Sequence, residues 1–312
     1  MEESELWRGL HRPDISRAEA DFVIQGIAFD GGCSQRQGAA LAPDYLRKRS
    51  GRNPPLTDRG EILDLNIFDA GNLNPRTGEE QDKFFQRVEK AAADIFSCGG
   101  LTGLPFPIFL GGDHSVTIPI LRALQQVRGD ELDSAAIIHI DSHLDICHEL
   151  DGNTLSHGST HRRGWELDLF SAEETYFIGI RSMEEQEVRF LQDKSTSIYG
   201  AEKIFERGIE NVAVEIKQEI EAEAVYITLD IDALDPAFAP GTGTPVAAGL
   251  STRQVYVLLR EFAGLPLAGM DLVEVSPPWD NSEITSYAAQ RLLFALIGFL
   301  TPEHKKVKMQ LN

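Results

Sequence analysis

Several features that would place this chain in a membrane, secreted or disulfide-rich class are missing. No run of about eighteen apolar residues is present, which argues against a membrane-spanning helix. The opening segment, MEESELWRGLHRPD, lacks the apolar core of a signal peptide. The three cysteines, Cys33, Cys98 and Cys147, are widely spaced and odd in number, which favours a reducing compartment over a disulfide framework. We therefore expect a cytoplasmic protein with no membrane partner.

Positive charge is also scarce. The 312 residues include 29 lysines and arginines against 49 acidic residues, for a formal net charge of −20. Nucleic acids are bound mainly through basic surfaces, so no nucleic-acid partner is expected. Such a chain would attract a small cationic substrate, although solubility alone also explains its charge.

Apolar runs separated by helical patterns predict the fold class. Strand-like runs span 22–30, 61–71, 107–115, 135–143, 175–182, 224–232 and 267–276. Helix-like segments span 79–100, 115–129, 201–224, 251–264 and 282–300, and Ser251 is a candidate N-cap. This alternation predicts an α/β protein with a parallel sheet covered on both faces. No repeat or linker divides the chain, so we expect one domain over 1–312, with 1–21 as an N-terminal extension.

Polar side chains gather where several of these strands should end. In open parallel sheets, ligands bind at the carboxyl ends of the strands. GGDHS, HIDSHLD, DIDALDP and Glu274 each follow an apolar run. In an extended strand alternate side chains share a face, so HIDSHLD would place His139, Asp141, His143 and Asp145 together. Four buried ionisable groups are costly unless something such as a metal compensates them.

These groups suit a pair of metal ions. Asp230 and Asp232 also alternate, and carboxylates so close take up a proton unless a cation lies between them. Imidazoles with carboxylates suit a divalent ion such as manganese. Six ligands exceed the need of one catalytic ion, so two ions sharing carboxylates are predicted, and such a pair makes a hydroxide from a bridging water at neutral pH. The predicted ligands are His114, Asp141, His143, Asp145, Asp230 and Asp232.

Each motif also has a simpler interpretation. A DxD at a strand end is commonly a cap or a turn, and GGDHS would also serve as a tight turn with a capping serine. His139 is interpreted as a core histidine, or one that supports a ligand, rather than as a ligand itself. The joint occurrence of the motifs at successive strand ends is what favours the metal site.

Together the motifs resemble the ureohydrolase family of arginases, agmatinases and related amidinohydrolases. The resemblance covers about residues 22–300 and is carried, in the family's order, by GGDHS, DSHLD, SHGS (156–159), LDIDALDPAFAPGTGTP (229–245) and MDLVEVSPPWD (270–280). It implies a three-layer α/β/α fold on a mostly parallel eight-stranded sheet. It also implies two manganese ions per subunit, with nickel or cobalt as alternatives, and a homo-oligomer of three or six chains.

The resemblance assigns roles that agree with the chemistry. The six predicted ligands match the family's metal ligands, with Asp141 and Asp230 as the bridging carboxylates. His157 matches a proton shuttle, which a leaving amine requires. Glu274 matches the glutamate that holds the guanidinium, as a planar cation needs a carboxylate partner. The catalytic candidates are thus His157, Glu274 and Asp145, and the candidates for binding substrate are Glu274, His157, Asn153 and Glu184.

Departures from the family pattern bear on the substrate. The usual GARxGP reads GAALAP here, with Ala40 and Ala42 at the arginine and glycine positions. Cys147 stands where arginases carry an asparagine that anchors the substrate carboxylate, and the arginase motif RDVD is absent beside Ser182 and Glu184. An amino-acid head group is therefore poorly served. We expect a dimanganese amidinohydrolase that cleaves a small cationic guanidino compound, agmatine in first place, to an amine and urea by hydroxide attack.

Other functions stay open at this point. The same chemistry would serve guanidinobutyrate, guanidinopropionate, arginine, free guanidine or a formimino compound. An acidic tail would require a nearby cation, for which Arg162, Arg163 and Arg181 are available in the sequence. A deacetylase can share this fold, but a neutral amide does not need Glu274. A metal-binding scaffold without turnover is the alternative outside enzymes.

Overall fold

A parallel eight-stranded sheet forms the centre of the molecule. The computed structural model describes residues 3–52, 54–99, 102–128 and 134–308. The strand order is β3-β1-β4-β9-β8-β5-β6-β7, and every adjacent pair is parallel. The strands are β1 (Phe22–Ile27), β3 (Ile67–Leu73), β4 (Phe106–Leu110), β5 (Ala135–Ile140), β6 (Thr175–Ile178), β7 (Ser197–Tyr199), β8 (Ala224–Asp230) and β9 (Leu267–Val273). The predicted α/β class and eight-stranded sheet are confirmed.

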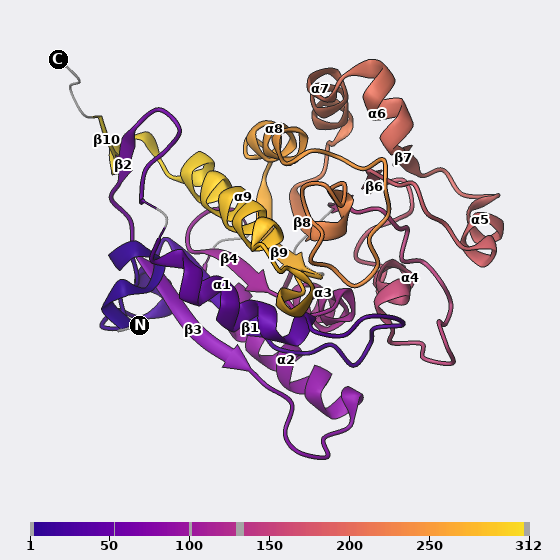
Figure 1. The fold of residues 1–312 in the computed structure, drawn as a ribbon, viewed down its shortest axis with the longest axis horizontal. Coiled ribbons are helices and arrows are strands. Elements are labelled where there is room, and N and C mark those ends of the chain that lie inside the picture. Colours follow the sequence, from indigo (N-terminus) through magenta and orange to yellow (C-terminus); the bar gives the residue numbers. More distant parts are fainter. Residues whose placement is uncertain (1–2, 53, 100–101, 129–133, 309–312) are drawn as a thin grey trace.

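Helices cover both faces of the sheet (Figure 1). On one face, α1 (Ala42–Ser50), α9 (Ile284–Leu300), α8 (Thr252–Phe262) and α7 (Ile209–Glu219) contact one another in that order. On the other face, α2 (Gln81–Phe96), α3 (Thr117–Arg128) and α4 (Thr160–Trp165) do the same. The short helices α5 (Glu185–Leu191) and α6 (Ala201–Arg207) lie near β7, at the far side from the N-terminus. These layers make a three-layer α/β/α arrangement.

The two-sided cover explains why the strands read as continuous apolar runs. In β8, Val225 and Ile227 pack into one buried cluster and Tyr226 into the other. In β1, Ile24 and Val23 divide in the same way. Because both faces of these strands are buried, apolar residues do not alternate with polar ones along the sequence.

The described part of the N-terminal extension packs onto the domain. Trp7 is fully buried, and its ring lies 6.2 Å from that of Phe294 on α9. Its indole N–H donates to Asp69 Oδ2 at 2.7 Å. Trp7 therefore connects the described part of the extension to α9 and β3, while residues 1–2 lie outside the described range.

Element boundaries differ from the sequence patterns at identifiable places. The run 61–71 divides, because β2 (Glu61–Leu63) pairs antiparallel with β10 (Lys306–Lys308) and only β3 joins the main sheet. The predicted helix 201–224 is broken at Gly208, whose φ of +80° favours glycine. The predicted cap is present, since Ser251 Oγ accepts the N–H of Gln254 at 3.2 Å. The ends of two predicted helices, residues 100 and 129, lie outside the described residues.

Within the described chain, no helix combines the length and the apolar character required to span a bilayer.

Candidate active site

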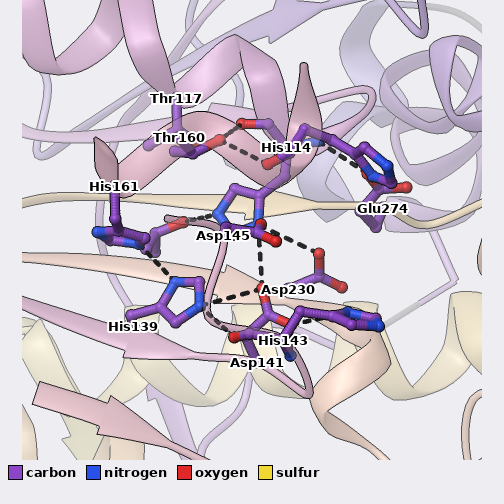
Figure 2. Close-up of polar contacts among 12 residues, drawn as sticks. His114, Thr117, His139, Asp141, His143, Asp145, Thr160, His161, Asp230 and Glu274 are labelled. Atoms are coloured by element: carbon purple, nitrogen blue, oxygen red, sulfur yellow. Dashed lines mark hydrogen bonds and ion pairs between the residues drawn. The ribbon is translucent and has the colours of Figure 1, made fainter. Parts of the chain in front are cut away.

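Four central strands bring distant parts of the sequence together. In the sheet β4, β9, β8 and β5 are neighbours. His114 lies at the start of η4 (His114–Val116) beyond β4, Asp141 follows β5, Asp230 ends β8 and Glu274 follows β9. Figure 2 shows His114, Asp141 and Asp230 gathered with His143 and Asp145, and Glu274 to one side of them. The predicted convergence of the polar groups at the carboxyl ends of the strands is confirmed by this arrangement.

The segment HIDSHLD is not one extended strand, so the alternate-face argument was wrong beyond residue 140. Strand β5 ends at Ile140, Asp141 Oδ1 accepts the His143 N–H at 2.7 Å, and Asp145 has a φ of +53°. Asp230 likewise accepts the N–H of Asp232, at 2.7 Å, where the chain turns into η7 (Ile231–Ala233). Aspartates commonly close such turns with their own side chains. One oxygen of each aspartate thus shapes the backbone, and the other faces the site.

The six predicted ligands form two connected groups. His114 Nδ1 lies 3.1 Å from Asp141 Oδ2, 2.9 Å from Asp145 Oδ2 and 3.3 Å from Asp230 Oδ2. His143 Nδ1 lies 3.2 Å from Asp232 Oδ2 and 3.5 Å from Asp141 Oδ1. Asp141 belongs to both groups of potential metal-binding side chains. A shared carboxylate of this kind suits two neighbouring ions.

The hydrogen bonds around His114 leave one nitrogen directed at the carboxylates. Its Nε2 lies 2.7 Å from Thr228 Oγ1, which donates its own proton to Asp271 Oδ1 at 2.6 Å. The ring therefore donates through Nε2, and in its neutral form Nδ1 carries a lone pair. His114 Nδ1 and Asp141 Oδ2 are both buried without a hydrogen-bond partner. A lone pair facing carboxylate oxygens requires a cation, and a divalent ion with nitrogen and oxygen ligands fits.

The pKa values of the clustered histidine and aspartates also favour bound cations. Burial lowers the pKa of His114, but the close carboxylates of Asp141, Asp145 and Asp230 outweigh it and hold that pKa well above its usual value. Burial, followed by the charges of Asp232 and Asp141, raises the pKa of Asp230 well above its usual value. Without a metal the cluster must take up protons to relieve the repulsion, and bound cations would replace them.

A histidine–glutamate pair lies beside the cluster. Glu274 Oε1 accepts the backbone N–H of His114 at 2.9 Å and lies 3.2 Å from His157 Nδ1. Glu274 Oε2 is buried without a hydrogen-bond partner. His157 Nε2 lies 2.9 Å from Ser34 Oγ. Burial lowers the pKa of His157, but the hydrogen bond and charge of Glu274 outweigh it and raise the pKa to about 9.

A cavity of about 320 Å³ opens beside these groups and has an acidic lining. His143 and His157 connect it to the cluster, and its acidic residues are Asp145, Asp151, Glu184 and Glu187. The buried Cys147 also lines it. Among the described residues, no lysine or arginine does.

The residues predicted to bind the substrate tail lie in different places, and so do the arginines considered as partners for an acidic tail. Glu184 lines the cavity, whereas Asn153 does not, and the Asn153 amide donates to Gln81 Oε1 at 3.2 Å. Arg181 is used internally, donating to the carbonyls of Val246 at 2.7 Å and Asp232 at 2.8 Å. Arg162 and Arg163 both pair with Glu166, away from the cavity lining.

Some supporting residues were missed by the sequence reasoning. Asp271 carried a signal, since it is a lone acid inside the apolar run LAGMDLV, but its partner Thr228 could be found only from the pairing of β8 with β9. Ser34 and His161 carried no signal in the sequence. Glu187 is buried against the backbone N–H of Ile146, which its Oε1 accepts at 2.9 Å.

The chain was compared with protein families, with known sequences and with solved structures. Residues 20–298 match the arginase family. A guanidinobutyrase of Pseudomonas aeruginosa is 32% identical over 292 residues, covering 92% of this chain and 88% of that protein. An agmatinase of Neisseria meningitidis serogroup A is 34% identical over 287 residues, covering 90% and 87%. The solved structure of proclavaminate amidino hydrolase from Streptomyces clavuligerus aligns with a TM-score of 0.82 at 30% identity, covering 93% of this chain and 94% of that one.

Proposed function

The chain belongs to the arginase family of metal-dependent hydrolases, and from that premise we propose that it is a dimanganese amidinohydrolase that cleaves agmatine to an amine and urea. The observation that carries the proposal is the His114–Asp141–Asp230 cluster lying directly beside the His157–Glu274 pair. A metal-binding scaffold would need the first group but not the second.

The side chains present fit two divalent ions. His114, Asp145 and Asp141 would hold one ion, and Asp141, His143 and Asp232 the other, with Asp230 shared beside them. The orphaned His114 Nδ1 and Asp141 Oδ2 support this assignment. Bound ions of this kind supply a water of lowered pKa, and so a hydroxide nucleophile at neutral pH. Manganese suits the oxygen-rich donors, with nickel and cobalt as alternatives.

The protein's own groups would bind the guanidinium and protonate the leaving amine. Glu274 Oε2, buried without a partner, is available to a planar cation, and a charge-assisted hydrogen bond is strong in such surroundings. His157, with a pKa raised to about 9, holds a proton at neutral pH that the departing amine can accept. Glu274 also keeps the His157 ring in place through its contact with Nδ1.

The lining of the cavity favours a cationic tail. The names of the similar proteins include both a guanidinobutyrase and an agmatinase, so they do not decide the tail. Glu184, Glu187 and Asp151 line the cavity, while the described lining includes no arginine or lysine. A substrate carboxylate would be desolvated here without a partner, which is costly. The thiol of Cys147 is only a weak hydrogen-bond donor and would not replace one.

A comparison of substrates tests the proposal. Urea release would be measured from agmatine, arginine, 4-guanidinobutyrate, 3-guanidinopropionate and guanidine at fixed manganese concentration and pH. We expect the highest kcat/KM with agmatine. Preference for an acid-tailed compound would overturn the choice of tail but not the reaction, whereas no urea from any of the five would overturn the reaction.

The proposal also covers the number of chains in the assembly and the compartment in which the enzyme works. We expect a homo-oligomer of three or six chains in the cytoplasm, on the resemblance to the family. Sedimentation of the purified protein would measure the number of chains in the assembly.

A further inference from the structure

Two buried histidines form a hydrogen-bonded pair behind the metal cluster. His139, on β5, and His161, on α4, have no exposed surface. His161 Nε2 lies 2.6 Å from His139 Nδ1, and His139 Nε2 lies 2.9 Å from the carbonyl oxygen of His143. Figure 2 shows the pair on the side of the cluster away from Glu274. The proposed reaction uses neither ring.

The hydrogen bonds fix where the protons are. The His143 carbonyl can only accept, so His139 must donate through Nε2. Neutral His139 then accepts at Nδ1, and His161 must donate to it through Nε2. His161 Nδ1 is left as an acceptor, and it is buried without a partner. Burial, the largest influence on both rings, lowers the pKa of each, which agrees with neutral imidazoles.

A third metal ion does not explain the pair. His114, His139 and His161 present nitrogens close enough together to suggest one. Two nitrogens bound to one ion at about 2.0–2.1 Å with tetrahedral angles are roughly 3.3 Å apart. The 2.6 Å between His139 Nδ1 and His161 Nε2 is a hydrogen-bond length instead.

The pair contacts the segment 141–145, which carries three of the predicted ligands, at its middle and at its end. His139 binds the carbonyl of His143, while the backbone N–H of His161 donates to the carbonyl of Asp145 at 2.8 Å. The orphaned His161 Nδ1 lowers stability, since an unsatisfied buried acceptor costs about 1–3 kcal/mol. Packing alone would be served by phenylalanine, because the ring lies against Phe177 with centroids 5.4 Å apart.

We infer that His161 is a positioning residue for the metal site: its proton fixes the tautomer in which His139 holds the carbonyl of His143, and this sets the turn that presents Asp141 and His143. The inference rests on the proposed metal-binding function. Residues that orient metal ligands typically change metal affinity by about 10–100-fold when they are replaced.

The test compares His161→Phe with His161→Gln. Phenylalanine keeps the ring packing but removes the donor, whereas the glutamine amide nitrogen can reach the position of Nε2. Manganese binding to the metal-free protein would be measured by equilibrium dialysis, with thermal unfolding of the same samples. We expect His161→Phe to bind manganese about tenfold more weakly with no loss of metal-free Tm. His161→Gln should bind manganese within about threefold of the wild type, which is a loss below the lower end of that range.

Each result decides the inference. Wild-type affinity in His161→Phe, or equal weakening in His161→Gln, would overturn it. If the wild type bound no manganese, the proposed function would fail instead, so the two failures are distinguishable. Should His161→Phe not fold, the double variant His139→Phe with His161→Phe leaves no unpaired imidazole nitrogen. Weakened manganese binding by that variant supports the inference, and wild-type affinity overturns it.

Discussion

At the scale of single residues, the two carboxylate oxygens of Asp141, and likewise those of Asp230, have different contacts. Asp141 and Asp230 each use Oδ1 to accept a backbone N–H two residues on, and Oδ2 to face His114. The interpretation of DxD as a turn and its interpretation as a ligand pair are therefore compatible. Substitution by asparagine keeps an acceptor for the turn while removing the charge, so it separates the two roles.

For Asp230→Asn we expect the metal-free protein to fold normally and manganese binding and turnover to be lost together. The loss should exceed the roughly 10–100-fold typical of residues that only support ligands. The metal-free Tm should not fall, because burial and like charges already raise the pKa of Asp230. Elemental analysis after manganese loading measures the result, and two tightly bound ions per chain would contradict it.

For Glu274→Gln we expect manganese to remain and turnover to fall. Glutamine can still accept the His114 N–H, but it loses the charge facing the guanidinium. A hydrogen bond to a charged group contributes about 1.5–3 kcal/mol, which corresponds to a loss in kcat/KM of about 10- to 150-fold. If the variant lost manganese instead, Glu274 would be a ligand and its assigned role would be wrong.

For Glu184→Gln we expect only a modest rise in KM for agmatine, up to about fivefold, because exposed ion pairs contribute about 0.2–1 kcal/mol. The matched control is Glu185→Gln, since Glu185 is the exposed neighbour that pairs with Arg189 and is not in the cavity lining. Equal effects from the two substitutions would remove Glu184 from the binding of the tail.

At the scale of elements, long periodic segments were predicted well and short ones were not. Helix α2 and strand β8 have enough residues for their patterns to show. Strand β7 has three residues, and the turn after Ile140 depends on aspartate side chains rather than on periodicity. The cluster of predicted ligands could be found from motifs near strand ends. His139 was already interpreted as a core or supporting histidine, but its partner His161 and the Thr228–Asp271 pair could not be found, because they depend on packing across layers and on strand register.

The close approach of the chain after β1 to the chain after β4 predicts a sharp effect at Gly112. A Cβ there would lie 1.7 Å from the carbonyl oxygen of Phe29, so backbone must shift next to Asp113 and His114. We expect Gly112→Ala to lower the free energy of unfolding by about 1–3 kcal/mol and to weaken manganese binding. In the control Gly298→Ala, on α9, the nearest atom is 3.6 Å away, and alanine should be neutral or stabilise by up to about 1 kcal/mol. Urea denaturation of both variants would test this, and similar free energies would contradict it.

At the scale of the whole molecule, cations bound at the candidate site would offset part of the negative charge of the chain. The net charge of −20 and the buried carboxylates at the end of the sheet both oppose a compact metal-free state. Bound ions stabilise the folded chain because they bind it in preference to the unfolded one. Stability and metal content should therefore rise together.

The pH dependence of the metal-free protein follows from His157. Its folded pKa, about 9, lies above the ordinary value of about 6.5, so its proton stabilises the folded state fully below pH 6.5. That stability is lost as pH rises through 9. We expect the free energy of unfolding to fall between pH 6.5 and 9 in urea titrations with a chelator present. His157→Asn should flatten this slope, and an unchanged slope would contradict the assignment.

The strand order also has a consequence for synthesis. Strands β4 and β5 leave the ribosome before β8 and β9, yet the two later strands lie between them in the sheet. A nascent chain that ends before residue 224 can pair β1 with β4 and β5 with β6, but it then has two half-sheets with open inner edges. Open strand edges are the surfaces through which chains aggregate. The growing polypeptide is thus most vulnerable to aggregation until its last third closes the sheet, and the proposed metal site, which includes Asp230 and Asp232, would be completed only at the same step.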